Sequence, residues 1–205
     1  MANLGLGNLI TLKRQLLAAS LQSKLDYDAV ITAIGQGVAA QFEGFCNRKF
    51  ERIVGDKHVV GADRDHVYLP RYPLEAVTAV EKRVSAAESW ITLTDAVQTW
   101  NEKSGLVYLG AVQGHWASHL RITFTGGYWY DTSEDEDGSL PAGATALPAD
   151  LRHAWYLQCR HAWDSIDKLG SGVKSKPGEM SNLSVLALVP DAKAILDTYV
   201  CYAIT

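Results

Sequence analysis

The sequence predicts an α+β protein in which a small helical bundle carries an inserted antiparallel β sandwich or rolled sheet. Apolar residues recur at three- and four-residue steps before residue 50 and again after residue 147, which is the spacing of amphipathic helices. Between these stretches, apolar and polar residues alternate in short runs, as half-buried strands require. The alternation ends at Gly126-Gly127-Tyr128, and helical spacing resumes after Leu147-Pro148.

Composition limits the class of protein. The chain has 205 residues, of which 47% are hydrophobic and 20% charged, enough for one domain, or for one domain with a large insertion. The formal net charge of −4 argues against tight binding of DNA phosphates, which requires clustered lysine and arginine. A protein that surrounds DNA without gripping it stays compatible with this charge.

The cysteines and the lengths of the apolar runs indicate in which cellular compartment the protein is expected. Cys46, Cys159 and Cys201 are far apart and odd in number, so neither a disulfide framework nor a zinc site is expected. The N-terminus lacks the pattern of a signal peptide, and the longest apolar run is too short to span a membrane. We therefore expect a soluble product of a reducing cytoplasm, with no membrane partner.

Two helices are expected at the start of the helical core, which should comprise residues 11–50 and 148–169. Thr11 can cap the first helix, and Asp26 or Asp28 the second. Gly35 and Gly37 lie inside the second helix, where each costs about 1 kcal/mol relative to alanine. Close approach of another backbone is therefore expected there. The apolar residues of the second helix are Val30, Ile31, Ile34, Val38, Phe42 and Phe45.

The β insertion is expected over residues 51–130. Gly105, Gly110 and Gly114 supply turns between its strands. Six or so short strands at this spacing predict a small sandwich or rolled sheet. The strand candidates are residues 58–60, 66–69, 77–80, 90–93, 106–109 and 120–124.

An acidic loop over residues 131–147 should connect the sheet to a long helix. Pro148 suits the first turn of that helix, and Asp150 favours its positive end. Residues 170–205 should form a linker and a C-terminal docking segment, whose last helix is expected from Asp191 to about Tyr202.

No motif in the sequence predicts catalysis or a cofactor. Residues 170–175 resemble a phosphate-binding loop, but Val173 stands where the second glycine is required and the segment follows a helix, so a linker is expected. Neither a Gly-x-Ser-x-Gly elbow nor a recognisable cysteine–histidine signature is present. We expect a protein that is not an enzyme.

Metal binding is not expected either. His115 and His119 are four residues apart, but the stretch around them is typical of a turn before a strand and offers no third ligand. His153, Cys159 and His161 belong to one helix, yet their steps of six and two residues do not place all three on one face.

The acidic loop carries five carboxylates within seven residues. These charges repel one another and cannot pack, so the loop must be solvated or face a partner. A calcium site is an alternative, but the alternating ligand order of an EF-hand is missing. The five residues are Asp131, Glu134, Asp135, Glu136 and Asp137.

Four further patterns occur in a fixed order and together cover most of residues 11–200. They are Phe45-Cys46-Asn47-Arg48-Lys49-Phe50, Leu69-Pro70-x-x-Pro73-Leu74-x-x-Val77, Phe124-Thr125-Gly126-Gly127-Tyr128 with Leu147-Pro148-x-Asp150-Leu151-x-x-Ala154, and Val189-Pro190 before Ile195-Leu196-x-x-Tyr199. In this order they resemble the head–tail connector (adaptor) proteins of long-tailed double-stranded DNA phages. The resemblance implies a virion protein of the neck that is assembled in the host cytoplasm. It implies a ring beneath the portal, which we expect to be dodecameric.

The same resemblance implies the partners of the chain. Such a ring extends the DNA channel, joins head to tail and offers a platform to the stopper or tail-completion protein, while the genome passes through without specific binding. The acidic loop could then face the channel and repel DNA, or face solvent. The family's C-terminal segment docks on the portal, which makes the candidates for portal docking Ile195, Leu196, Tyr199, Val200 and Tyr202.

The chain departs from the family pattern near its C-terminus. The family often carries a basic residue soon after the position of Tyr199, where this chain has the apolar run Val200-Cys201-Tyr202. Two alternatives therefore stay open. The chain could be a stopper or tail-completion protein of the neck, or, from another class, a small cytoplasmic enzyme or a carbohydrate-binding module that uses the β part.

Overall fold

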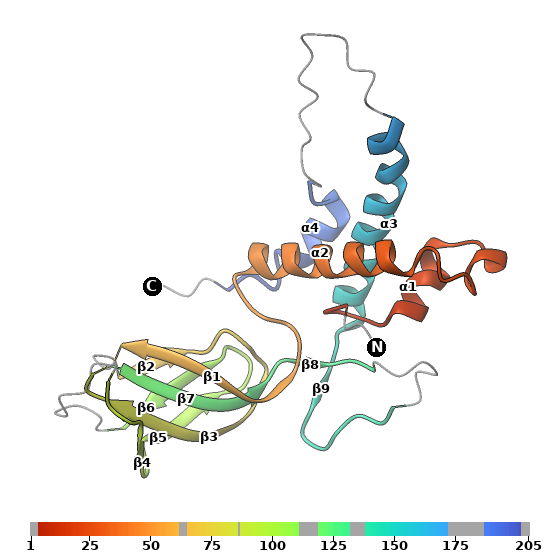
Figure 1. The fold of residues 1–205 in the computed structure, drawn as a ribbon. Helices are drawn as coiled ribbons and strands as arrows, with labels where there is room; N and C mark the ends of the chain where they lie inside the picture. The colour runs from red at the N-terminus through yellow and green to blue at the C-terminus, as the bar shows by residue number, and fades with distance from the viewer. Residues whose placement is uncertain are drawn as a thin grey trace, which may run out of the picture. The chain divides into compact units, whose positions relative to one another are not determined.

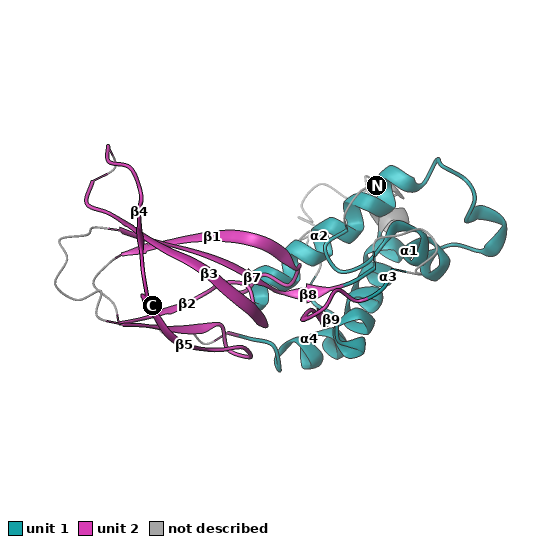
Figure 2. Cartoon of the chain, turned by 90° about the horizontal axis from the view of Figure 1, so that it is seen from below, with its two compact units in different colours: residues 1–46, 130–139, 147–200 teal, residues 47–129, 140–146, 201–205 magenta. Residues whose placement is uncertain are grey.

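The structure is a computed structural model that describes residues 4–61, 65–85, 87–110, 119–131, 138–171 and 187–201. The chain divides into two compact units (Figure 2). The helical unit comprises residues 1–46, 130–139 and 147–200, and the β unit comprises residues 47–129, 140–146 and 201–205. The predicted α+β class, with helices and an inserted antiparallel β structure, is confirmed (Figure 1).

In its described residues, the helical unit contains four α-helices and one short 3-10 turn. They are α1 (Leu9–Leu16), the 3-10 turn Ala19–Leu21, α2 (Asp28–Cys46), α3 (Ala149–Ser171) and α4 (Pro190–Leu196). Asn8 caps α1 by accepting the Thr11 N–H at 2.8 Å, so the expectation that Thr11 is the cap is wrong by three residues. The last helix ends at Leu196 and not near Tyr202.

Trp155 joins α3 to α2 in the core of the helical unit. Its side chain is fully buried, and its Nε1 donates a hydrogen bond to the Gly35 carbonyl at 3.1 Å. A Cβ on Gly35 would lie 3.2 Å from both Leu12 and Trp155. The expected close approach therefore occurs at Gly35, but side chains make it and not a backbone. At Gly37 a Cβ would meet nothing within 4 Å, so the expectation is wrong there.

A partly buried ion pair fixes the start of α2. Lys13 of α1 is buried, and its Nζ lies 2.5 Å from Asp28 Oδ1 and 2.9 Å from the Lys24 carbonyl oxygen. The two acceptors come from both sides of the turn that precedes α2. Lys13 therefore ties that turn to α1, because its buried ammonium donates to both partly buried acceptors.

The described part of the β unit contains two antiparallel sheets and a short parallel pair. The four-stranded sheet has the order β1-β7-β3-β4, the three-stranded sheet has the order β2-β6-β5, and β8 pairs with β9 in parallel. The strands are β1 (Ile53–Gly61), β2 (His66–Tyr68), β3 (Leu74–Arg83), β4 (Ile91–Leu93), β5 (Val97–Asn101), β6 (Leu106–Leu109), β7 (His119–Gly126), β8 (Tyr128–Trp129) and β9 (Thr145–Ala146).

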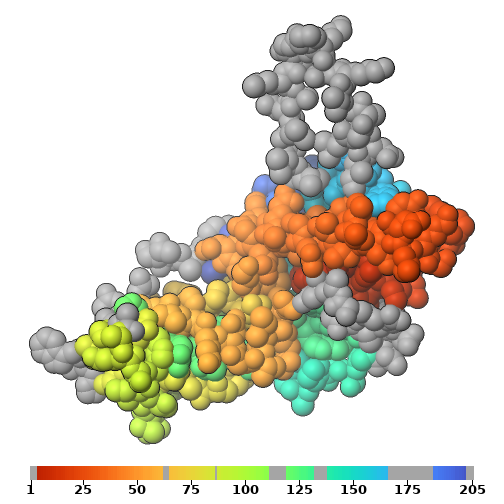
Figure 3. All heavy atoms as spheres, viewed as in Figure 1, coloured from red at the N-terminus to blue at the C-terminus, as the bar shows by residue number. Residues whose placement is uncertain are grey.

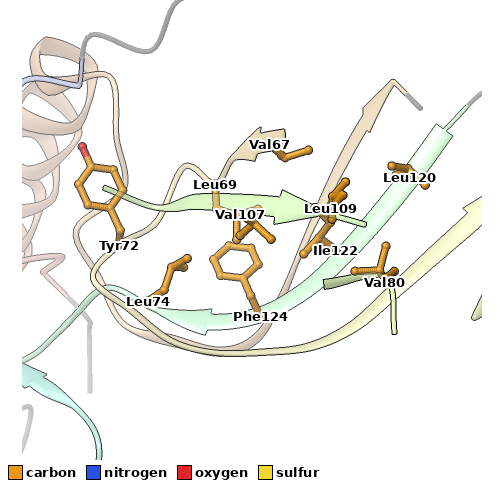
Figure 4. Packing of buried hydrophobic residues seen from close by; sticks show 11 residues of the cluster. Val67, Leu69, Tyr72, Leu74, Val80, Val107, Leu109, Leu120, Ile122 and Phe124 are labelled. Carbon is orange, nitrogen blue, oxygen red and sulfur yellow. The ribbon is translucent and has the colours of Figure 1, made fainter. Parts of the chain in front are cut away.

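The two antiparallel sheets pack face to face around one apolar core (Figure 4). Central strand β7 contributes Leu120, Ile122 and Phe124, all of which are fully buried. The opposite sheet contributes Val67 of β2 and Val107 of β6. Because side chains alternate across a strand, the residues between these five point away from the core. The sandwich expected from the strand spacing is the observed arrangement.

The segment Gly126-Gly127-Tyr128, where the chain leaves the β insertion, is hydrogen-bonded to the segment by which the chain enters it. The Tyr128 N–H donates to the Phe50 carbonyl at 2.7 Å, and the Arg52 N–H donates to the Tyr128 carbonyl at 3.0 Å. Gly127 has φ +99°, and a Cβ there would overlap the Glu51 carbonyl group. Only glycine combines this backbone conformation with so close a neighbour. The chain thus enters and leaves the β unit along adjacent paths.

Candidate interaction surfaces

Within the part of the chain that the structure describes, no three His, Cys, Asp or Glu residues are placed to hold a metal ion. Burial raises the pKa of the Cys159 thiol, which therefore stays protonated. His115 lies outside the described residues. Among the described helices, none is long and apolar enough to cross a membrane.

Arg48 is a buried cation at the entry to the β unit. Its guanidinium carbon lies 3.4 Å from the centre of the Tyr72 ring and 5.1 and 5.4 Å from the centres of the Phe50 and Tyr128 rings. It also donates a hydrogen bond to the Tyr72 carbonyl. Among the described residues no carboxylate forms an ion pair with Arg48, and the faces of these aromatic rings stabilise its charge instead. Arg48 therefore holds the entry and the Tyr72 corner together.

The C-terminal segment packs on the helical unit through one face of α4. Ala192 and Leu196 are fully buried, and the Leu196 carbonyl lies 3.6 Å from the Cys46 sulfur. Buried Gln158 of α3 holds the chain before α4: it donates to the Ala187 carbonyl at 3.3 Å and accepts the Val189 N–H at 2.9 Å.

The residues predicted to dock on the portal fall into two groups. Leu196 faces inward and is inaccessible in this conformation. Ile195, Tyr199 and Val200 are partly exposed, and the Tyr199 hydroxyl donates to Asp150 Oδ1 at 2.8 Å. Tyr202 lies outside the described residues.

Asp131 closes the base of the acidic segment. Its Oδ2 accepts the Gly138 N–H at 2.5 Å, and its carbonyl oxygen lies 3.5 Å from the Asn8 side-chain nitrogen. Asp131 therefore has a structural role, because it hydrogen-bonds to Gly138. Its position in an acidic run did not reveal this role. The other four acidic residues, Glu134 to Asp137, lie outside the described residues.

An arginine–tryptophan cluster covers the outer side of the four-stranded sheet. Arg121 of β7 and Glu81 of β3 form a two-pronged ion pair with N–O distances of 2.6 and 2.7 Å. The guanidinium carbons of Arg83 and Arg121 each lie 4.5 Å from the centre of the Trp90 ring. We call the surface the Arg–Trp face; it consists of Lys57, Val59, Glu81, Arg83, Trp90 and Arg121.

Strand register places these side chains in rows. Val59 pairs with Arg121, Arg121 with Glu81, and Glu81 with Thr92, so one row crosses all four strands. The hydrogen bonds from Arg121 hold the pKa of the Glu81 carboxyl below its usual range, with a smaller contribution from the charge of Lys57. The ion pair therefore persists at neutral pH. Sequence patterns did not reveal this face, because its residues come from three distant segments.

The three-stranded sheet exposes a second aromatic surface. His66 and Tyr68 of β2 and Tyr108 of β6 point away from the core, and the His66 ring centre lies 5.9 Å from that of Tyr68 and 6.4 Å from that of Tyr108. Tyr68 and Tyr108 are 39% and 44% exposed. Aromatic side chains that are left this open are typical of protein–protein contact surfaces.

Comparison with known proteins finds similarity in structure only. Neither a protein-family model nor a curated protein matches the chain. A chain in the virion of a native gene transfer agent particle matches with a TM-score of 0.65 and 16% identity, covering 100% of this chain and 94% of that one. A chain in the neck of an empty gene transfer agent particle, computed with C6 symmetry, matches with a TM-score of 0.62 and 15% identity over the same shares of the two chains.

A third structure extends the comparison to another symmetry. A chain in the neck of the native particle, computed with C12 symmetry, matches with a TM-score of 0.51 and 16% identity, covering 94% of this chain and 92% of that one. At these identities the similarity establishes a shared fold. That fold includes both the helical and the β elements, since nearly the whole of each chain is matched.

Proposed function

We propose that the chain is a structural virion protein of the neck of a phage-like particle, where it acts as a head–tail adaptor. The observation that supports this best is the match of the entire fold to chains in the neck and virion of gene transfer agent particles. A catalytic role has no comparable support. The four sequence patterns that resemble phage adaptors lie in both units, so the resemblance and the fold agree along the chain.

The proposed adaptor forms a closed ring, in its simplest form a dodecamer. The support is that two of the similar neck structures have C6 and C12 symmetry. Such a ring would bind beneath the portal and extend the DNA channel. The net charge of −4 suits a channel through which DNA slides, since a chain with more carboxylates than cations does not attract phosphates as a whole.

The C-terminal segment is the proposed contact with the portal. Ile195, Tyr199 and Val200 are accessible in part, so they can make this contact without rearrangement. Leu196 can join them only if α4 leaves the helical unit, because its side chain is fully buried there. The acidic segment is proposed to face solvent or the channel in the assembled neck.

Removing residues 184–205 tests the docking role in particles. We expect DNA-filled heads that carry portal but no tails, because the proposed contact is lost. A fall in infectious or transducing titre of at least a hundredfold should accompany this result. Titre and tail attachment are measured on purified particles by plating and negative-stain microscopy. Normal tailed particles would contradict the proposal.

Point variants separate docking from folding, because the deletion also uncovers buried Cys46 and Gln158. The double variant Ile195→Ala/Tyr199→Ala leaves buried Leu196 in place and should reproduce the tailless heads. The control Lys193→Ala/Asp197→Ala removes an exposed ion pair between α4 and the residue that follows it. Because such a pair contributes little to stability, the control should assemble normally.

A stopper or tail-completion protein is the second candidate function. The observation that favours it is the C6 symmetry of one similar neck structure, since sixfold order is compatible with a position on the tail side. Copy number and binding partner separate the two roles. An adaptor should bind purified portal directly, whereas a stopper should bind only after another ring is in place.

A further inference from the structure

The four-stranded sheet begins and ends with a strand that has a neighbour on one side only. Among the residues that the structure describes, β1 pairs with β7 and β4 pairs with β3, and neither pairs with another strand. Each of the two strands therefore presents a row of backbone N–H and C=O groups on which another strand can form. The two edges lie at opposite sides of the sheet (Figure 1).

These edges lack the features that usually keep a sheet edge from pairing, which are lysine, proline and bulges. In β1 the bulge lies between Ile53 and Asp56, and the single lysine is Lys57. The rest of the strand, residues 58–61, has none of these features. The Ile-Thr-Leu sequence of β4 has neither lysine nor proline, and its pairing with β3 is regular. Both edges are therefore able to accept a further strand.

Strand direction makes the two edges complementary. In an antiparallel sheet of four strands, the first and the last strand run in opposite directions. Neighbouring copies in a ring are related by a rotation, which is small when the ring has many copies and leaves strand directions almost unchanged. The β4 strand of one copy would therefore meet β1 of the next in antiparallel order. The edges of the three-stranded sheet, β2 and β5, would instead meet in parallel, which is the less stable pairing.

The register within the sheet predicts which residues would lie opposite each other. One row of paired residues runs from Val59 on β1 to Thr92 on β4, and the next row runs from Val60 to Ile91. Continuing these rows into a neighbouring copy places Thr92 opposite Val59 and Ile91 opposite Val60. All four are β-branched, and such side chains pack well across strands. A shift by two residues would place Lys57 opposite Thr92 and lose this match.

We propose that, in the ring, β4 of one copy pairs in antiparallel order with β1 of the next, so that the four-stranded sheets join into one continuous sheet. This inference rests on the proposed ring and names the strands of one contact between its copies. A closed ring requires each copy to offer two different surfaces that fit each other, and the opposite edges of one sheet meet that condition. Closing the ring leaves neither edge free, so the pairing also stops the sheet from growing further.

Exposed apolar side chains at both edges support this occupant. Val59 is 46% exposed and Ile91 is 56% exposed in the single copy, and both would be removed from water by the pairing. Because β4 has only three residues, the backbone hydrogen bonds that it can add are few. The pairing therefore determines the direction and register of the contact, and other surfaces of the copies can add to its strength.

Paired cysteines in the full-length chain test the contact. The background is Cys201→Ser, which removes the one described cysteine that is not buried. In this background Val59→Cys/Thr92→Cys should form disulfides between copies under mild oxidation, with purified portal present if rings form only on it. Non-reducing electrophoresis should show a ladder of covalent oligomers up to the full ring. A disulfide within one chain is excluded, because three strand spacings of about 4.8 Å separate β1 from β4.

Two controls show whether the contact joins different edges. A mixture of the single variants Val59→Cys and Thr92→Cys, in the same background, should give dimers only, because each chain then has one cysteine at the contact. The variant Tyr68→Cys/Thr99→Cys places the pair on β2 and β5, the edges of the other sheet, and should give no ladder.

Lysine substitutions test the same contact without cross-linking. Val59→Lys and Ile91→Lys should each weaken ring formation at least tenfold, measured as the concentration of half-assembly by mass photometry, because each places a charge in the pairing edge. The matched control is Val54→Lys, on the same strand as Val59. Val54 is 68% exposed but lies outside the stretch opposite β4, so this variant should assemble normally.

Thermal unfolding followed by circular dichroism should give the same midpoint for every variant. If Val59→Cys/Thr92→Cys unfolds, Val60→Cys/Ile91→Cys tests the next row. Rings that form but give no ladder with the paired cysteines would overturn the proposal, as would normal assembly of both lysine variants. A ladder from the β2–β5 control alone would likewise overturn it, because the other sheet would then join the copies. Failure of the unmodified chain to form any ring, alone or on the portal, would instead contradict the proposed function itself.

Discussion

At the scale of single residues, Trp155 and Gly35 determine how closely α3 approaches α2. The indole nitrogen donates to the Gly35 carbonyl, and its ring occupies the space that a Gly35 side chain would need. The sequence predicts helix over the two stretches that contain these residues, 11–50 and 148–169. It could not pair the two residues, because they are 120 positions apart and no local pattern links them.

The glycines of α2 give a prediction at this scale. Gly37→Ala should raise the free energy of unfolding by about 0.5–1 kcal/mol, because alanine favours the helix and its Cβ meets no atom within 4 Å. Gly35→Ala makes the same change of propensity but places a Cβ 3.2 Å from Leu12 and Trp155. It should therefore be less stable than Gly37→Ala by at least about 1 kcal/mol. Urea unfolding measures both; equal stabilities would contradict the packing described.

Among the elements, the long helices and the core strands were the most predictable. The helices α2 and α3 carry apolar stripes, and β7 alternates strictly, so their burial follows from their sequences. The strand β5 was missed, because four of its five residues are exposed and no alternation marks it. The pairing of β7 between β1 and β3 was also beyond prediction, since partner choice depends on packing across the whole unit.

The interaction surfaces also differ in how far they could be predicted from the sequence. The C-terminal residues could be proposed from a short local pattern, although the pattern could not tell that Leu196 faces inward. The Arg–Trp face left no local signal, because Arg83, Trp90 and Arg121 meet only after three strands have paired. Asp131 resembled its acidic neighbours in sequence, and only the fold reveals its hydrogen bond to Gly138.

Edge strand β1 gives a prediction of pH dependence through His58. Partial burial lowers the pKa of this imidazole, and the nearby charge of Asp56 opposes the shift in part. A lowered pKa means that the unfolded chain binds a proton more readily than the folded chain. Stability should therefore fall as pH is lowered through about 6.5, the ordinary pKa of histidine, towards the folded value.

The variant His58→Gln should remove this component of the pH dependence. The free energy of unfolding is measured for both proteins at pH 7.5, 6.5 and 5.5, and the difference between them should shift in favour of the variant as pH falls. His153→Gln, an exposed position on α3, provides the matched control. A constant difference between His58→Gln and the unmodified chain would show that the imidazole is not desolvated in the folded state.

At the scale of the whole molecule, two units of different architecture divide the proposed work. The helical unit holds the C-terminal segment and the base of the acidic loop. The β unit presents the Arg–Trp face and the aromatic surface of the smaller sheet. In Figure 3, α2 is exposed along the side of the helical unit that faces the viewer. Part of the surface of this unit is therefore available for contacts in the proposed ring. An assembly part needs several such surfaces, one for each partner.

Cryo-electron microscopy of the chain bound to the portal protein from the same particle tests the neck-adaptor proposal most directly. We expect a closed ring on the portal, with its axis along the DNA channel and twelve copies, the symmetry of one similar neck structure. Density for the C-terminal segment should contact the portal. A chain that remains monomeric and leaves the portal bare would contradict the adaptor role.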